Sequence, residues 1–73
     1  MPARLRRIIA AAEEYGITVE PPRGGSHWKA RKAGFRSYPI PAHRGEETMI
    51  GDVYIRGFCR NFAIDRNEFI DKL

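Results

Sequence analysis

Cys59 is the only cysteine in a chain of 73 residues. One thiol cannot form an internal disulfide, and one thiol with two histidines cannot supply the ligands of a structural zinc site. A domain of this size buries only about 60% of the surface of its unfolded chain, so its core is small. We therefore expect a single domain, residues 1–73, held by one apolar core and too small for a cofactor cleft between two lobes.

Arginine dominates the positive charge of the chain. Lys and Arg number 13 against nine Asp and Glu, and ten of the 13 are arginine. The guanidinium group binds phosphate through two hydrogen bonds, so this composition favours a nucleic-acid partner, although an ordinary basic domain has it too.

No segment is long and apolar enough to cross a membrane. The basic start precedes an apolar run that is too short for a signal peptide and ends at Glu13 and Glu14, which predicts a reduced, cytoplasmic protein.

The N-terminal segment carries one apolar stripe at helical spacing, formed by Leu5, Ile8, Ile9 and Ala12. The run Ala10–Ala12 adds helix propensity. Gly16 stands where a left-handed cap would end such a helix. The pattern therefore predicts a first helix over residues 3–15.

Three strands are predicted after this helix. The β-branched run Ile17–Val19 must end at Pro21-Pro22, because proline cannot donate to a strand ladder. Ser26–Arg31 alternates with a period of two, and a short turn at Lys32–Gly34 separates it from a third strand, Phe35–Ile40. Pro39 and Pro41 indicate either an edge position for the third strand or an early end of it.

Two more helices are predicted in the C-terminal half. Thr48 is the expected N-cap of a helix that runs to about Phe62. Asp65 and Glu68 have the spacing of a capping box, which predicts a short last helix from Arg66 to the chain end. The order predicts an α+β fold, α-β-β-β-α plus a short C-terminal helix, in which the helices pack on one face of a three-stranded antiparallel sheet. The other face of the sheet is then open to solvent or to a partner.

The candidate functional residues lie on the second predicted strand. If Trp28 packs inward, the alternation directs His27, Lys29 and Arg31 outward. Histidine has an ordinary pKa of about 6.5 and can accept or donate a proton near neutral pH. RNA carries its own nucleophile, the 2′-hydroxyl, so its cleavage needs only a base, an acid and positive charge at the phosphate. His27 is therefore either the centre of a metal-free ribonuclease or a surface histidine without a role.

His43 follows the third predicted strand and has three interpretations: a complementary acid, a phosphate contact or a hydrogen-bonded loop anchor. A metal site would need a third ligand such as Glu46 or Glu47, and the spacing gives no support for one. The chain also has no glycine-rich phosphate loop that ends in Lys-Ser or Lys-Thr, so we do not expect nucleotide triphosphate chemistry. We expect neither a metal nor a cofactor. Cys59 lies among apolar residues and is interpreted as a core residue rather than a nucleophile.

Other side chains are open to two interpretations each. The aromatic residues of the second and third predicted strands can stack on bases or belong to the core, and these are Trp28, Phe35 and Tyr38. Ser26 can be a nucleophile, but no acid–histidine–serine chain is visible, and a role in the turn beside the glycines is the simpler interpretation.

The order of elements and three short motifs resemble the HicA toxins of bacterial and archaeal HicA–HicB toxin–antitoxin pairs. The resemblance covers nearly the whole chain, from about Leu5 to Leu73. Its motifs are Glu14–Val19 at the end of the first helix, Gly25-Ser26-His27 at the start of the second strand, and Pro41-Ala42-His43 after the third strand.

This resemblance implies a double-stranded-RNA-binding-domain-like fold and the activity of an mRNA interferase, an endoribonuclease that cleaves mRNA and halts growth. It implies that His27 is the catalytic residue and that a HicB-like antitoxin binds the toxin in a hetero-oligomer and blocks this histidine. With it we expect Arg23, Lys29 and Arg31 to hold the RNA backbone. His43 is a candidate second acid, base or phosphate contact, and a phosphate-activating Lys29 is the other candidate for the second proton-transfer group.

Two other function classes fit the same residues. A non-catalytic RNA-binding module would bind structured RNA by shape and leave it intact. A protein-interaction domain would bind an acidic partner and have no affinity for RNA even at low salt.

Overall fold

The computed structural model describes residues 1–73 and confirms an α+β fold with a three-stranded antiparallel sheet and the α-β-β-β-α order. Strands β2, β3 and β4 form this sheet in chain order, and a second sheet pairs β1 with β5. The elements are β1 (Ala3–Arg4), α1 (Leu5–Glu13), β2 (Thr18–Glu20), β3 (His27–Arg31), β4 (Tyr38–Pro41), the 3-10 turn η1 (Gly45–Glu47), β5 (Met49–Ile50), α2 (Asp52–Asn61) and α3 (Arg66–Asp71).

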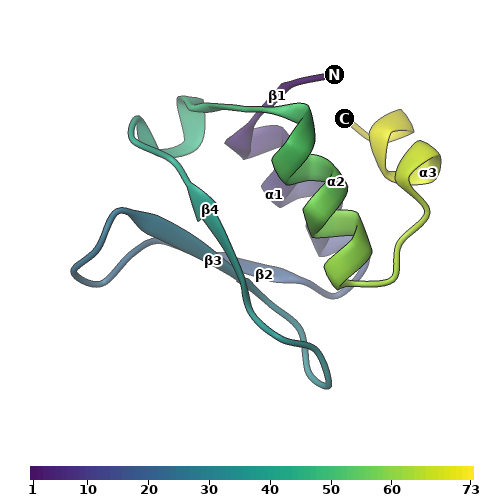
Figure 1. Ribbon diagram of the computed structural model, residues 1–73, viewed down its shortest axis with the longest axis horizontal. Coiled ribbons are helices and arrows are strands. Elements are labelled where there is room, and N and C mark those ends of the chain that lie inside the picture. The colour runs from purple at the N-terminus through teal and green to yellow at the C-terminus, as the bar shows by residue number, and fades with distance from the viewer.

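Helices α1 and α2 cover one face of the three-stranded sheet (Figure 1). Helix α1 contacts β2, and α2 contacts both β4 and α3. Between the two layers lies a core of buried apolar residues that includes Leu5 and Ile8 of α1, Ala30 and Ile40 of the sheet, and Phe58 of α2. No polar or charged residue is buried. The helices thus occupy one face, as predicted, and the other face of the sheet stays open.

An aromatic cluster joins α3 to the rest of the core. The ring of Phe58 lies 5.0 Å from that of Phe62 and 5.1 Å from that of Phe69, centroid to centroid. Tyr15, just after α1, lies 5.9 Å from Phe69. Tyr38 of β4 presents its ring edge to Phe58 at 6.1 Å. The short last helix is therefore fixed against both longer helices by aromatic contacts.

The first helix begins later than predicted. Residues Ala3–Arg4 are extended and pair with Met49–Ile50, so α1 begins at Leu5 instead of residue 3. The backbone N–H of Leu5 donates to the Thr48 carbonyl at 2.9 Å, which holds the start of α1 beside β5. Gly16 has a φ of +74°, the left-handed conformation predicted at the end of this helix.

The third strand of the main sheet is shorter than predicted and lies further along the chain. A tight turn forms because Gly34 has a φ of +86° and the N–H of Phe35 donates to the Lys32 carbonyl at 3.0 Å. Residues 35–37 therefore belong to the connection, and β4 begins at Tyr38 opposite Ala30. The predicted edge position is confirmed, since β4 pairs on one side only, with β3.

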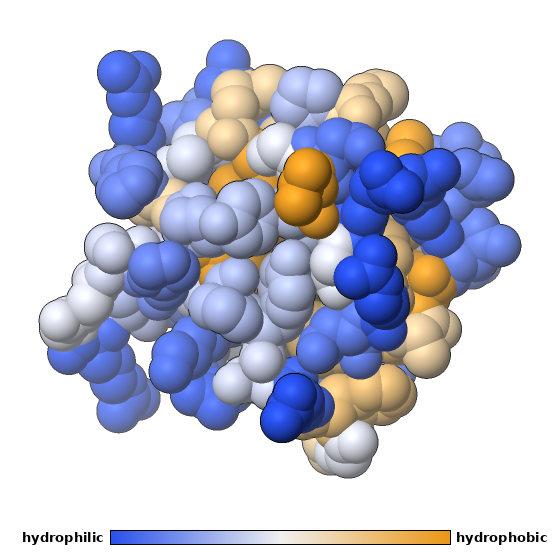
Figure 2. Space-filling view, in the orientation of Figure 1, coloured by the Kyte–Doolittle hydropathy of each residue, from blue (hydrophilic) through white to orange (hydrophobic).

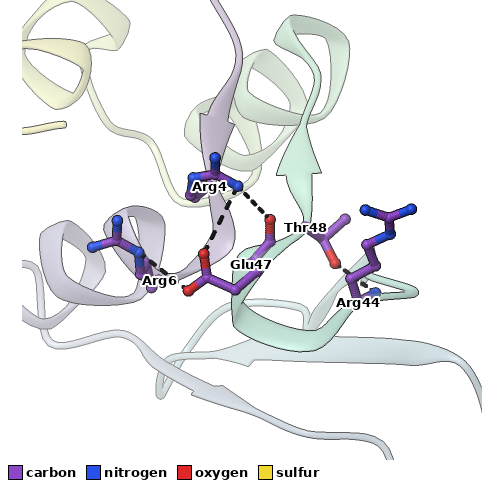
Figure 3. Close-up of polar contacts among 5 residues, drawn as sticks. All are labelled: Arg4, Arg6, Arg44, Glu47 and Thr48. Carbon is purple, nitrogen blue, oxygen red and sulfur yellow. Dashed lines mark hydrogen bonds and ion pairs between the residues drawn. The ribbon is translucent and has the colours of Figure 1, made fainter.

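The prediction that Thr48 caps the second helix is wrong. Its Oγ1 accepts a hydrogen bond at 2.8 Å from the backbone N–H of Arg44, so this hydroxyl closes the loop before β5 (Figure 3). The N-cap of α2 is Gly51, which has no side chain to offer. The predicted cap of the last helix is confirmed, because Asp65 Oδ1 accepts from the backbone N–H of Glu68 at 3.1 Å.

Glu47 fastens η1 to the N-terminal segment (Figure 3). Arg4 donates through Nη1 to the Glu47 carbonyl oxygen at 3.0 Å. The Glu47 carboxylate also pairs with Arg4 at 3.8 Å and with Arg6 at 3.4 Å. A single carboxylate thus contacts two guanidinium groups of the N-terminal segment.

The surface is mostly hydrophilic. In Figure 2 blue side chains cover most of the view, and orange is limited to small separate patches. None of the helices combines the length and the apolar character that crossing a membrane requires. The large apolar side chains that remain exposed are Met1, Phe35, Met49, Val53 and Tyr54.

Candidate functional site

The outward side chains of β3 are those that the alternation predicted. Ala30 is fully buried, and Trp28 packs against the core on the same side. His27, Lys29 and Arg31 lie between them in the sequence and are exposed on the opposite face. The condition set by the sequence, that Trp28 packs inward, is therefore met.

A hollow of about 640 Å³ opens on this outer face. Its walls are the connection 21–26 and the outward side chains at the end of β2 and along β3. The four residues predicted to cleave and hold RNA all line it, namely Arg23, His27, Lys29 and Arg31. The fold therefore brings the whole predicted set together except for His43.

The connection between β2 and β3 shapes one end of the hollow. Pro21 and Pro22 end β2 because neither can donate to the ladder with β3. Gly24 has a φ of +140°, a conformation that side-chain-bearing residues rarely adopt. The chain turns there and enters β3 at His27, which pairs with Pro41 of β4. In Figure 1 this connection projects beyond the sheet at the end where β3 begins.

The His27 imidazole has one contact with a protein side chain. Ser26 Oγ lies 3.4 Å from Nδ1, at the long end of hydrogen-bonding distance. Nε2 has no hydrogen bond to the protein, so it is available to a bound molecule. This contact supports a role of Ser26 in the turn and in orienting the ring.

Glu20 is the one acidic side chain that lines the hollow, and it was not among the site residues predicted from the sequence. It lies opposite Lys29 in the register of β2 and β3. Its Oε1 accepts a hydrogen bond at 2.9 Å from Arg31 Nε, and both side chains are about half exposed. The signal for Glu20 was present in the sequence, because a strand ending at Pro21 must alternate and so directs Glu20 to the face opposite Val19.

The two histidines do not share a hollow. His43 is exposed in the loop after β4 and does not line the hollow that contains His27. No three His, Cys, Asp or Glu side chains are grouped so that they could hold a metal ion. Glu47, one of the ligands considered with His43, is paired with Arg4 and Arg6.

Of the remaining candidates, Cys59 is in the core, Trp28 and Tyr38 pack against it, and Phe35 is exposed. Cys59 is 3% exposed, and burial raises the pKa of its thiol, so the interpretation as a core residue is confirmed. Trp28 and Tyr38 are partly buried against the core. Phe35 is 40% exposed and lies 5.8 Å from the Phe62 ring, with Lys32 Nζ 5.4 Å from its own ring centre.

No family model, curated protein or solved structure matches the chain. The resemblance to HicA toxins therefore stays a prediction based on the motifs around His27 and His43. The evidence for a function therefore comes from the residues on the outer face of the sheet.

Proposed function

We propose that this protein is an RNA-cleaving toxin of the HicA kind, a metal-independent endoribonuclease of the cytoplasm with His27 as its catalytic residue. One observation carries the proposal: an exposed imidazole shares an open hollow with three basic side chains, Arg23, Lys29 and Arg31. A histidine and neighbouring cations are sufficient to cleave RNA, because the RNA itself supplies the nucleophile, its 2′-hydroxyl. The Gly25-Ser26-His27 motif, which ends at the first residue of β3, adds the resemblance to HicA toxins as further support.

The reaction uses the RNA 2′-hydroxyl. The neutral imidazole of His27 accepts the hydroxyl proton while the 2′-oxygen attacks the adjacent phosphorus. The bond from phosphorus to the 5′-oxygen breaks, which leaves a 2′,3′-cyclic phosphate and a 5′-hydroxyl end. Of the two candidates for the second proton-transfer group, only Lys29 lines the hollow with His27, so we assign to its ammonium group the proton that the leaving 5′-oxygen takes up. Exchange with water then restores both side chains.

The basic side chains stabilise the charge that develops on the phosphate. Lys29 follows His27 by two positions on the same face of β3, which separates their backbones by about 7 Å. Arg23 approaches from the connection 21–26, on the other side of His27 along the chain. Positive charge thus comes from both neighbours of the imidazole, where it favours the transition state.

The partner of such a toxin is an antitoxin that covers the outer face. The sheet face around His27 carries no other part of the chain, and its charge is predominantly positive. We propose that a HicB-like protein with a complementary acidic surface binds there and excludes RNA.

The test is cleavage of a long single-stranded RNA by the purified protein in excess EDTA. We expect wild type to cleave it and to leave a strand with 2′-deoxyribose intact. His27→Ala should lower the cleavage rate by about a hundredfold to ten-thousandfold with RNA binding retained. His43→Ala is the matched control, because it removes an exposed histidine outside the hollow, and it should keep wild-type activity.

Three results would contradict the proposal. Cleavage by folded His27→Ala would remove His27 from the chemistry. Cleavage that stops in EDTA would show that a metal ion is needed. RNA that wild type binds but never cleaves would identify a non-catalytic RNA-binding module of the same fold.

A further inference from the structure

The ion pair between Glu20 and Arg31 marks a second anion-binding position on the outer face. Arg31 Nε donates to Glu20 Oε1 at 2.9 Å. Guanidinium groups bind carboxylate and phosphate oxygens in the same planar geometry, so the Glu20 carboxylate stands where a phosphate oxygen would bind. No other acidic side chain lines the hollow, whose other charged side chains are Arg23, Lys29 and Arg31.

This carboxylate can be displaced by a stronger anion. The Arg31 and Glu20 side chains are 54% and 48% exposed, and solvent-exposed pairs of this kind favour the paired state by only about two- to fivefold. Lys29 lies directly opposite Glu20 across β2 and β3, so an incoming phosphate would meet Lys29 and Arg31 as neighbouring cations. Glu20 therefore weakens binding at this position without preventing it.

The three outward side chains of β3 are evenly spaced. His27, Lys29 and Arg31 occupy alternate positions of one extended strand, so their backbones follow one another at intervals of about 7 Å. An extended single strand of RNA offers one phosphate per nucleotide at a comparable interval. A regular duplex curves away from a straight row of side chains, so this row fits a single strand better.

We propose that β3 binds three consecutive phosphates of an extended single-stranded RNA, at His27, Lys29 and Arg31 in turn, and that the RNA must displace Glu20 to reach Arg31. The assignment of the reacting phosphate to the His27 end rests on the proposed function. The row of phosphate positions and the role of Glu20 rest on the strand geometry and the ion pair.

The experiment measures the affinity of 2′-O-methyl oligonucleotides, which cannot be cleaved, as a function of length. Wild type should bind more tightly when a third phosphate is added to an oligonucleotide with two. Glu20→Gln should enlarge this gain by about two- to fivefold, because the competing carboxylate is gone. Arg31→Ala should abolish the gain. For a longer strand it should also reduce the slope of log affinity against log salt concentration by about 0.7, the value expected for one phosphate contact.

The controls carry the same charge changes elsewhere. Glu13→Gln on α1 and Arg36→Ala in the turn after β3 alter exposed charges that do not line the hollow. They should leave the gain from the third phosphate as it is in wild type. The proposal is overturned if Arg31→Ala weakens all lengths equally, if Glu20→Gln has the effect of Glu13→Gln, or if duplex RNA binds as well as a single strand.

These results separate the two proposals. If cleavable RNA stays intact while the length dependence behaves as expected, the ribonuclease proposal fails and the three phosphate positions stand. If RNA is cleaved in a reaction that requires His27 but the affinity does not rise with a third phosphate, the ribonuclease proposal stands and the proposed phosphate positions are wrong.

Discussion

Gly57 lies in the middle of α2 because Tyr38 occupies the space of a side chain there. A Cβ at position 57 would overlap the Tyr38 hydroxyl oxygen and lie 3.1 Å from its ring Cζ. The Tyr38 hydroxyl donates to the Tyr54 carbonyl at 3.0 Å, and its ring packs edge-on against Phe58. This close approach fastens β4, the strand paired with His27, to the helix layer.

The effect of Gly57→Ala is the difference of opposing contributions. Helix propensity alone predicts that alanine stabilises α2 by about 1 kcal/mol. Displacing Tyr38 costs about 1 kcal/mol for its hydrogen bond and about 1 kcal/mol for its contact with Phe58. Off-rotamer strain in the crowded site adds about 1 kcal/mol. We therefore expect Gly57→Ala to lower the free energy of unfolding by about 2 kcal/mol.

The assay is urea unfolding followed by circular dichroism, in wild type and in a Tyr38→Phe background. Tyr38→Phe removes the overlapping oxygen and leaves only ring contacts of 3.1 and 3.3 Å to the new Cβ. Gly57→Ala should then cost at least about 1 kcal/mol less than in wild type, a coupling that a double-mutant cycle measures. Stabilisation by Gly57→Ala in wild type, or an equal cost in both backgrounds, would refute the steric argument.

Three further predictions concern groups away from the hollow. Tyr15→Phe should raise the free energy of unfolding in urea by about 1 kcal/mol, because the Tyr15 hydroxyl is buried without a hydrogen-bond partner, and a loss of stability would show that it has one. Cys59 should react with a disulfide reagent at least about a hundredfold more slowly in the folded protein than in urea, because burial raises the pKa of its thiol and so lowers the fraction of thiolate. A rate near that of a free thiol would contradict the placement of Cys59 in the core. Stability should fall as the pH rises above about 10, because burial raises the pKa of Tyr15 and Tyr38 and the hydrogen bond that Lys72 donates to Glu14 raises the pKa of Lys72, so each protonated form is favoured by folding. A urea midpoint that stays constant to about pH 11 would be inconsistent with these shifts.

Local patterns in the sequence predicted the parts of the fold that depend on a few neighbouring residues. The alternation along β3 placed His27, Lys29 and Arg31 together, because a strand with one buried face fixes the direction of every side chain. The left-handed Gly16 and the cap at Asp65 are equally local. These features need no knowledge of what lies across the core.

The features that the sequence did not predict have no clear local pattern in the sequence. Ala3 and Arg4 fit the helical pattern, but β5 recruits them into a ladder of two residues that has no periodicity to detect. Thr48 is a residue type typical of an N-cap, yet its hydroxyl accepts a hydrogen bond from the backbone N–H of Arg44, four residues earlier. Glu20 belongs to a strand of three residues, which is too short for the alternation of its side chains to form a clear pattern.

The outer face is built from one continuous stretch of chain, residues 18–41, whereas β1 and β5 join Ala3 to Ile50. Closing the short connections of the β2–β3–β4 meander costs less chain entropy than closing the long loop between β1 and β5. The ladder of two residues also has few hydrogen bonds to repay that entropy. During folding the sheet that carries His27 can therefore form before β1 pairs with β5, and in the native protein β1 can separate from β5 while the outward row of His27, Lys29 and Arg31 keeps its shape.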